Sequence, residues 1–243
     1  MIGRVFAFIL FAFSIGGAGL YWGSRNRALP VRRERWIKFA TYVCVIHVVL
    51  VCALLGPRVL VAMFFLIFLI GAIELDHVLR RLDGRRVLLR AGISVAYFLL
   101  GLGLLSFFSI ATKEMAIFVY LVVATFDGFS QVVGNVFGTH PLTPKISPGK
   151  TIEGTLGGLF FALVMAGFLH PLVRMPMWHS LAAGTWIVAA GFLGDLLASS
   201  VKRASGVKDF GRILPGHGGV LDRFDSLLVA APAALLILYQ SVF

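Results

Sequence analysis

The sequence predicts an all-α protein, a bundle of about eight helices that spans a membrane. Three observations support this fold class: an apolar composition, eight long apolar runs, and basic residues that alternate from one side of these runs to the other. Of the 243 residues, 59% are hydrophobic and 14% are charged, whereas soluble domains average roughly 45–50% and about 25%. The composition therefore excludes a soluble enzyme, a disordered chain and a secreted disulfide scaffold.

Each of the eight apolar runs approaches the roughly 20 residues that a helix needs to cross a bilayer core. The runs are residues 5–22, 37–55, 59–75, 91–110, 115–133, 154–169, 181–198 and 224–243. The sixth run is the shortest and opens with Gly154, Gly157 and Gly158, which we interpret as a close helix contact rather than a break. The first run lacks a clear small-residue cleavage site and further spans follow it, so we expect no cleavable signal peptide.

The connecting segments predict which side of the membrane each loop faces. Of the 22 Lys and Arg residues, 18 lie after the first, third, fifth and seventh runs, and only Arg4, Arg58, Lys113 and Arg174 lie on the other side. The side richer in Lys and Arg stays in the cytoplasm. We therefore expect both termini to face away from the cytoplasm, and the bacterial inner (cytoplasmic) membrane is the expected location. The net charge of +11 is explained by this topology and by anionic lipid headgroups, not by nucleic-acid binding.

The chain is divided by these patterns into two parts. Residues 1–110 are expected to be N-terminal transmembrane helices, and residues 111–243 a C-terminal catalytic domain with cytoplasmic loops 134–153 and 199–223. Nearly all acidic residues fall at the cytoplasmic side. Asp127 and Asp195 stand out because neither has a basic residue within one helical turn, and an ionisable group inside a span is costly unless it serves a partner, an ion or water.

Residues 194–226 carry the strongest chemical pattern in the chain. They read GDLLASSVKRASGVKDFGRILPGHGGVLDRFDS, which combines cations, carboxylates and glycines. Glycines let backbone N–H groups approach phosphate oxygens, cations neutralise phosphate charge, and carboxylates hold hard divalent ions. The segment therefore predicts a site for a metal-bound polyphosphate.

The position and charge of each side chain in this segment suggest its role. Asp195 and Asp222 are the first candidates for Mg²⁺ ligands, and Asp225 is a third ligand or a group that orients the ligands. His217 either donates to a phosphate or fixes a turn, and Arg212 is interpreted as a topology or headgroup charge. The side chains expected to contact phosphates are Lys202, Arg203, Lys208 and Arg223.

A second candidate segment lies between the fifth and sixth runs. Pro141, Pro144 and Pro148 prevent a long helix there and predict an extended, rigid connection. The following SPGKT places a hydroxyl, a glycine and a lysine before a helix start, which suits phosphate binding. The segment is not a Walker A loop, because Pro144 stands where that loop needs a glycine.

The run SSVKRASGVKDFGRILPGHGGVLDRFDS resembles the signature of the CDP-diglyceride synthetase family, also called phosphatidate cytidylyltransferase. GDLL before it and SPGKTIEG resemble two further elements of that family, so the likeness covers about residues 125–228. It implies a polytopic enzyme that joins CTP and phosphatidic acid into CDP-diacylglycerol, uses Mg²⁺ near the cytosolic face and often acts as a homodimer.

The resemblance also implies site residues. Asp195 and Asp222 match the metal-site carboxylates, and Asp127 occupies the Asp of an Asp-x-x-Ala-Tyr element whose other residues here are Gly-Phe-Ser-Gln. Two further departures are Ala198 in place of Glu and Gly149 in place of Lys. The remaining matched positions are Ser199, Lys202, Arg203, Lys208, Asp209, His217, Arg223 and Asp225 in the signature, and Ser147, Lys150, Thr151 and Glu153 in the second element.

The expected reaction is an in-line displacement in which the lipid phosphate attacks the α-phosphorus of CTP and pyrophosphate leaves. Three alternatives are distinguished by their products. A CTP-dependent lipid kinase would transfer the γ-phosphoryl group instead, a divergent family member would act on another lipid phosphate, and a transporter or scaffold would catalyse nothing. No repeated half is visible in the sequence, which argues against a transporter.

Overall fold

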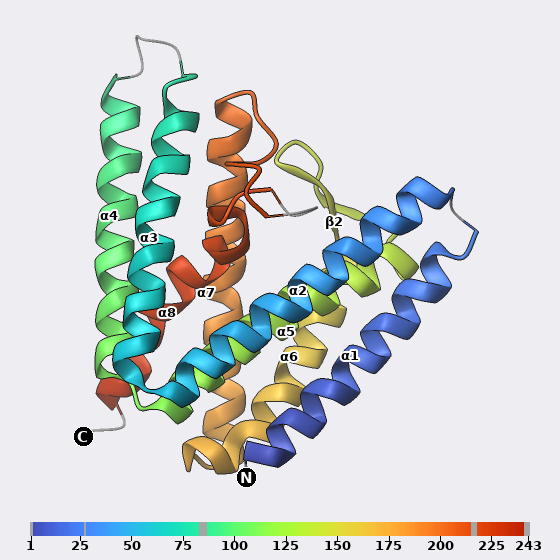
Figure 1. The fold of residues 1–243 in the computed structure, drawn as a ribbon, viewed down its shortest axis with the longest axis vertical. Coiled ribbons are helices and arrows are strands. Elements are labelled where there is room, and N and C mark those ends of the chain that lie inside the picture. Colours follow the sequence, from blue (N-terminus) through green and yellow to red (C-terminus); the bar gives the residue numbers. More distant parts are fainter. Residues whose placement is uncertain (1, 27, 83–86, 215–217, 241–243) are drawn as a thin grey trace.

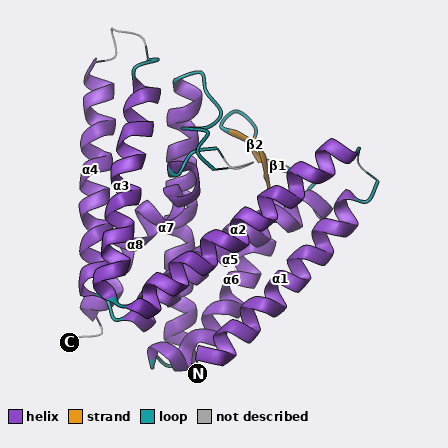
Figure 2. Cartoon of the chain, viewed as in Figure 1, coloured by secondary structure: helices purple, strands orange, loops and turns teal. Residues whose placement is uncertain are grey.

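The computed structural model describes residues 2–26, 28–82, 87–214 and 218–240. Within these residues the chain forms eight helices and one two-stranded hairpin (Figure 2). The helices are α1 (Ile2–Ser24), α2 (Leu29–Leu55), α3 (Pro57–Leu79), α4 (Val87–Ile110), α5 (Lys113–Phe137), α6 (Ile152–Val173), α7 (Met177–Ala204) and α8 (Leu221–Gln240). The strands are β1 (Pro141–Thr143) and β2 (Ser147–Thr151).

The predicted all-α membrane bundle is confirmed, with one helix for each apolar run. Six helices in the described part of the chain, α2 to α7, are long and apolar enough to cross a bilayer. The other two, α1 and α8, have 23 and 20 residues and belong to the same bundle. The last predicted run continues to residue 243, beyond the described residues.

Glycine and proline set one sharp turn between consecutive helices. Gly56 follows α2 with φ +126°, a backbone conformation that favours glycine. Pro57 is the first residue of α3, where its missing N–H costs no helical hydrogen bond. The chain therefore turns sharply at Gly56, and α2 and α3 diverge from this turn (Figure 1).

Helix α5 is the central helix of the bundle. Residues 115–124 are all buried, as expected of a helix that is apolar on every side. Helices α1 and α2 pack against α5, whereas α3 and α4 pack against α8 on the other side of the molecule (Figure 1). Both N-terminal helical hairpins therefore contact helices of the C-terminal half.

The close contact predicted from the glycines of the sixth run is confirmed. Helix α6 is continuous, and its start packs tightly against α5. A Cβ atom at Gly157 would lie 2.6 Å from Cγ1 of Val133, and one at Gly158 would lie 2.7 Å from the carbonyl oxygen of Phe126. Glycine at these positions lets the two backbones approach.

Both predicted loops are shorter than expected. Helix α5 continues to Phe137, and the expected extended connection folds back on itself as an antiparallel β1–β2 hairpin. The all-α prediction missed this hairpin because three prolines indicate extended backbone but not its pairing. The second loop spans only residues 205–220, since α7 continues to Ala204. Lys202 and Arg203, which were expected in the loop, form the last turn of α7 instead. Basic residues are favourable there because they interact with the negative end of the helix dipole.

Candidate active site

A polar cavity of about 670 Å³ lies at the end of the bundle that carries the hairpin and the 205–220 loop. Its wall contains residues from α2, α5, β2, α6, α7, α8 and the loop. Thirteen of the side chains predicted from the sequence line it: Asp127, Ser147, Lys150, Thr151, Asp195, Ser199, Lys202, Arg203, Lys208, Asp209, Asp222, Arg223 and Asp225. Residues far apart in the chain are thus brought to one cavity of a size that holds small ligands.

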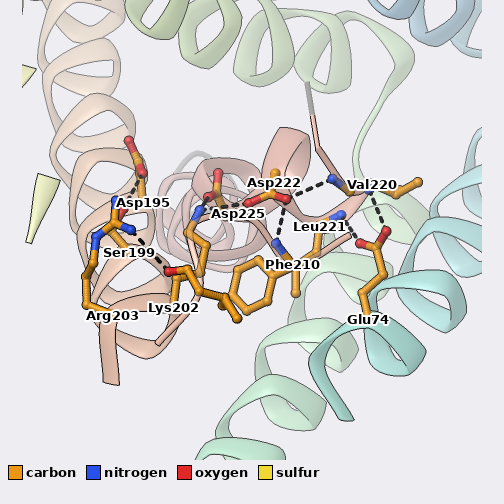
Figure 3. A network of polar contacts seen from close by, with 12 residues as sticks. Glu74, Asp195, Ser199, Lys202, Arg203, Phe210, Val220, Leu221, Asp222 and Asp225 are labelled. Atoms are coloured by element: carbon orange, nitrogen blue, oxygen red, sulfur yellow. Dashed lines mark hydrogen bonds and ion pairs between the residues drawn. The ribbon is translucent and has the colours of Figure 1, made fainter. Parts of the chain in front are cut away.

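An ion pair between α7 and α8 forms the floor of this site. The Nζ of Lys202 donates to Oδ1 of Asp222 at 2.8 Å and lies 3.7 Å from Oδ2 of Asp225 (Figure 3). The other oxygen of Asp222 accepts the backbone N–H groups of Phe210 and Gly219, each at 2.8 Å. Lys202 and Asp222 are 8% and 6% exposed. Asp222 therefore anchors the 205–220 loop at Phe210 and at Gly219.

Two predicted site residues contact each other in this environment. Both carboxylate oxygens of Asp222 accept hydrogen bonds, from Lys202 and from the loop backbone, so Asp222 anchors the loop, and its predicted Mg²⁺ contact stays a prediction. Lys202 lies beside the two carboxylates of α8 and neutralises them, and its predicted phosphate contact stays a prediction as well. A buried charge needs such partners, since its desolvation costs several kcal/mol.

Glu74 is a site residue that the sequence interpretation missed. This α3 side chain is 5% exposed, and its two oxygens accept the backbone N–H groups of Val220 at 3.0 Å and Leu221 at 2.8 Å (Figure 3). The carboxylate thus caps the N-terminus of α8, where the helix dipole favours negative charge. Its position at the end of an apolar run was the only local signal, because its partners lie 146 and 147 residues away.

The glycines of the loop fit closely around Glu74. A Cβ atom at Gly219 would lie 2.6 Å from the Glu74 carboxyl carbon, and one at Gly211 would lie 2.9 Å from it. No larger residue fits there without displacing the carboxylate. The glycines of the signature therefore serve the packing of the loop onto α3 as well as any approach to phosphate.

Three other carboxylates line the cavity from three helices: Asp127 of α5, Asp195 of α7 and Asp225 of α8. Their negative charges repel one another. Asp195 Oδ2 pairs with Lys150 Nζ at 2.7 Å, a partner from the hairpin that no helix-local argument could find. Asp225 Oδ1 accepts the backbone N–H of Ser226 at 2.9 Å.

The chemistry of these three carboxylates fits a hard divalent cation, which prefers oxygen ligands and would relieve their repulsion. Within the described residues, no three His, Cys, Asp or Glu side chains converge closely enough to hold a metal ion as they stand. The donor types are therefore present, and their convergence on an ion would require side-chain rearrangement.

The hairpin is joined to the 205–220 loop by Arg203. Its Nε donates to the carbonyl oxygen of Ile146 at 3.0 Å, and its Nη1 donates to that of Val207 at 3.1 Å. Arg203 thus connects the two candidate segments directly. Two of its five N–H donors meet backbone carbonyls, and because Arg203 also lines the cavity, its phosphate contact stays a prediction.

Thr151 and Glu153 organise the start of α6. The Thr151 hydroxyl accepts the N–H of Gly154 at 3.1 Å and caps the helix. Glu153, in contrast, is absent from the cavity wall. Its carboxylate accepts the backbone N–H of Thr139 at 3.1 Å and pairs with Nδ1 of His140 at 2.5 Å. The prediction that Glu153 binds a ligand is therefore corrected to a role at the base of the hairpin.

Three cationic side chains of the cavity wall form no ion pair among the described residues. They are Lys208, Arg212 and Arg223, and the buried Nε of Arg223 has no hydrogen-bond partner among these residues. Arg212, interpreted from the sequence as a topology or headgroup charge, thus stands in the cavity wall. His217 lies outside the described residues.

Helix α2 also contributes to the cavity, although the sequence resemblance begins only near residue 125. Glu34, Lys38 and Tyr42 line the wall, and Lys38 Nζ pairs with Glu34 Oε1 at 2.6 Å. These positions carry no motif, and a four-residue Glu–Lys spacing is common on any solvated helix. Only the packing of α2 on α5 identifies them as part of the site.

Comparison with known proteins agrees with this geometry. The chain is 41% identical over 152 residues to the phosphatidate cytidylyltransferase of Staphylococcus aureus, covering 61% of this chain and 58% of that protein. It is 40% identical over 152 and 151 residues to the proteins of the same name from Staphylococcus epidermidis and Staphylococcus haemolyticus. The match thus spans less than three fifths of the length of these curated relatives.

A family model covers nearly all of the chain. The model of the cytidylyltransferase family matches residues 5–241, a range that includes every helix that lines the cavity. The match therefore extends well beyond the two motifs quoted from the sequence. On this match, the chain belongs to the cytidylyltransferase family.

Proposed function

We propose that this protein converts CTP and phosphatidic acid into CDP-diacylglycerol and pyrophosphate, as a step of phospholipid biosynthesis. The observation that carries the proposal is one cavity, at one end of a membrane bundle, that combines three carboxylates with Lys208, Arg212 and Arg223. Membership of the cytidylyltransferase family and the names of the relatives support the same reaction.

The proposed reaction is a transfer of the cytidylyl group. A phosphate oxygen of the lipid attacks the α-phosphorus of CTP and forms a new phosphorus–oxygen bond. The bond from that phosphorus to the oxygen bridging the α- and β-phosphates breaks, and its electron pair leaves with pyrophosphate. A phosphate monoester has a second pKa near about 6, so the attacking group is largely dianionic at neutral pH and needs no strong base.

The side chains of this chain would act mainly by position and charge. Lys208, Arg212 and Arg223 would contact the phosphates of the two anionic substrates, whose mutual repulsion is the chief obstacle to reaction. Asp222 and Lys202 hold the 205–220 loop and thereby set the direction in which these cations point. Thr151 and Lys150 place the hairpin at the opposite wall.

Asp127, Asp195 and Asp225 are the residues that would hold Mg²⁺. The ion would supply charge neutralisation of the triphosphate and of the departing pyrophosphate. Asp225 replaces Asp222 in this proposal, because the oxygens of Asp222 are committed to Lys202 and the loop backbone.

The proposed setting is the bacterial inner membrane, with the cavity open to the cytoplasm. The distribution of Lys and Arg supports this orientation. Helix α1 begins and α8 ends at the end of the bundle opposite the cavity (Figure 1), as expected if both termini face away from the cytoplasm. A site at the boundary would let a water-soluble nucleotide meet a lipid headgroup.

A label-transfer assay tests the proposal. Purified protein in detergent is incubated with phosphatidic acid, Mg²⁺ and CTP labelled with ³²P at the α-phosphate, and the lipids are extracted. We expect label in the lipid phase, release of pyrophosphate, and loss of both with EDTA. Transfer of label only from γ-labelled CTP would identify a lipid kinase instead, and no transfer by folded protein with either nucleotide would reject the proposal.

A further inference from the structure

A second cavity adjoins the candidate active site on the side of α1. It lies between α1, α2 and α5, and its wall is largely apolar. The side chains that give it this character include Phe13, Phe39, Ile46, Leu121 and Met165. We call this space the α1–α2–α5 groove. It contains none of the carboxylates of the active-site cavity.

The groove and the active-site cavity share part of their walls. Lys38, Tyr42 and Gln131 line both. The Tyr42 hydroxyl donates to the carbonyl oxygen of Ala124, which fixes the ring of α2 against α5 between the two spaces. A polar cavity and an apolar groove therefore meet at one junction, and the junction carries a cationic side chain, Lys38, which pairs with Glu34 at 2.6 Å.

The groove follows the helices into the membrane. Its wall on α1 extends from Gly23, near the cytoplasmic junction, to Ile9, a distance of about 21 Å at a rise of 1.5 Å per residue. One leaflet of a bilayer core is about 15 Å deep. The groove is thus long enough to follow a hydrocarbon chain through the leaflet that borders the active site, and its volume of about 110 Å³ holds a segment of that chain rather than all of it.

Glycines of α1 leave the room for such a chain. Gly16, Gly19 and Gly23 line the groove, and a Cβ atom at Gly16 would make ordinary van der Waals contact with Phe39 at 3.5 Å. A Cβ atom at Gly16 is therefore tolerated. The outer atoms of a larger side chain, such as leucine, would occupy the groove.

We propose that the α1–α2–α5 groove holds one acyl chain of the acceptor lipid and places its phosphate at the junction beside Lys38. This inference rests on the proposed function, since it assigns the acceptor subsite of that reaction. The apolar wall suits hydrocarbon and not a nucleotide or free phosphate, while the cation at the polar end suits the phosphate to which the chain is joined. The N-terminal helices would thus select the lipid, and the C-terminal helices would carry the phosphate chemistry.

The test compares two acceptors that differ only in chain length, dioleoyl and dihexanoyl phosphatidic acid, in mixed micelles. Gly16→Leu fills the groove, and the control is Ala18→Leu, an exposed position on α1 that does not line the groove. The readout is the ratio of kcat/KM for the long-chain acceptor to that for the short-chain acceptor. We expect Gly16→Leu to lower this ratio about tenfold or more, because two or more methylene groups lose their place, and we expect Ala18→Leu to leave it unchanged.

The outcomes separate this inference from the proposed function. A ratio in Gly16→Leu equal to that of the unsubstituted protein, or equal to that of Ala18→Leu, would overturn the acyl-chain assignment even though transfer continues. An equal loss with both acceptors would also overturn it, since the groove would then matter for folding rather than for the chain. Failure of the unsubstituted protein to transfer label to either acceptor would instead reject the proposed function.

Discussion

Asp222 and Asp225 stand three residues apart at the start of α8, yet their surroundings differ. Asp222 accepts hydrogen bonds from Lys202, Phe210 and Gly219. Asp225 accepts one backbone N–H and lies farther from Lys202, at 3.7 Å. Asp222 thus holds the loop in place, whereas Asp225, one helical turn later, lies near the other carboxylates of the cavity.

This difference predicts opposite effects of the same substitution. Asp222→Asn should lower the free energy of unfolding by about 1–3 kcal/mol, because an amide cannot replace both accepting oxygens. Asp225→Asn should leave the unfolding temperature unchanged or higher, since it removes a repelling charge, and should lower cytidylyl transfer at least about 100-fold. Thermal unfolding in detergent and the label-transfer assay measure the two effects.

Each variant is the control for the other. Wild-type transfer by Asp225→Asn would show that Asp225 is no metal ligand. Unchanged stability of Asp222→Asn would contradict its role as the loop anchor.

At the scale of elements, α3 and α8 are joined by Glu74. The α8 N-terminus has backbone N–H groups without partners inside the helix, and Glu74 accepts two N–H groups at this end. Helix α8 also carries Asp222, Arg223 and Asp225. Helix α3, in the N-terminal half of the chain, therefore sets the position of these candidate site residues.

Glu74→Gln tests this connection. The amide nitrogen of Gln would face one of the two N–H groups, leaving a buried donor unpaired at a cost of about 1–3 kcal/mol. We expect a correspondingly lower free energy of unfolding and about a tenfold lower kcat, with KM for CTP nearly unchanged, because Glu74 contacts the loop and not the cavity.

Asp76→Asn is the matched control on the same helix. Asp76 is exposed and, among the residues that the structure describes, pairs with its neighbour Arg80 at 2.8 Å, and exposed pairs contribute about 0–1 kcal/mol. It should behave as the unsubstituted protein. Wild-type kcat and stability in Glu74→Gln would mean that the cap has no part in positioning α8.

The elements also show where local sequence patterns are informative. Apolar runs located all eight helices, because helix formation in a bilayer depends on local hydrophobicity and on internal hydrogen bonding. The β1–β2 hairpin and the true ends of the 205–220 loop were not predictable in this way. They depend on contacts such as the one between Arg203 and Ile146, which lie 57 residues apart.

At the scale of the whole molecule, the candidate active-site loops lie at one end of the bundle, and the start of α1 and the end of α8 lie at the other (Figure 1). The Lys and Arg distribution predicts that the loop end faces the cytoplasm. Residues exposed at the two ends can report this orientation: Lys145 at the tip of the hairpin, and Lys113 at the start of α5.

Single cysteines at these positions test the orientation in cells. In a background with Cys44 and Cys52 replaced by alanine, Lys113→Cys should react with a membrane-impermeant thiol reagent in intact spheroplasts. Lys145→Cys should react only after lysis, because its side chain faces the cytoplasm. The reverse pattern would place the cavity outside the cytoplasm and exclude access to CTP.

By itself, the sequence determined the membrane class, the eight helices, the expected sidedness and most of the residues in the active-site cavity. These features depend on local properties, namely hydrophobicity, charge and motif spacing. The tertiary structure decided which carboxylate anchors the loop, that Lys150 meets Asp195, that Glu74 caps α8, and that α1 and α2 form an apolar groove beside the site. The physical reason is distance along the chain: a hydrogen bond, ion pair or cavity between residues of different elements, 12 to 147 positions apart in these contacts, exists only once the helices and the loop have packed.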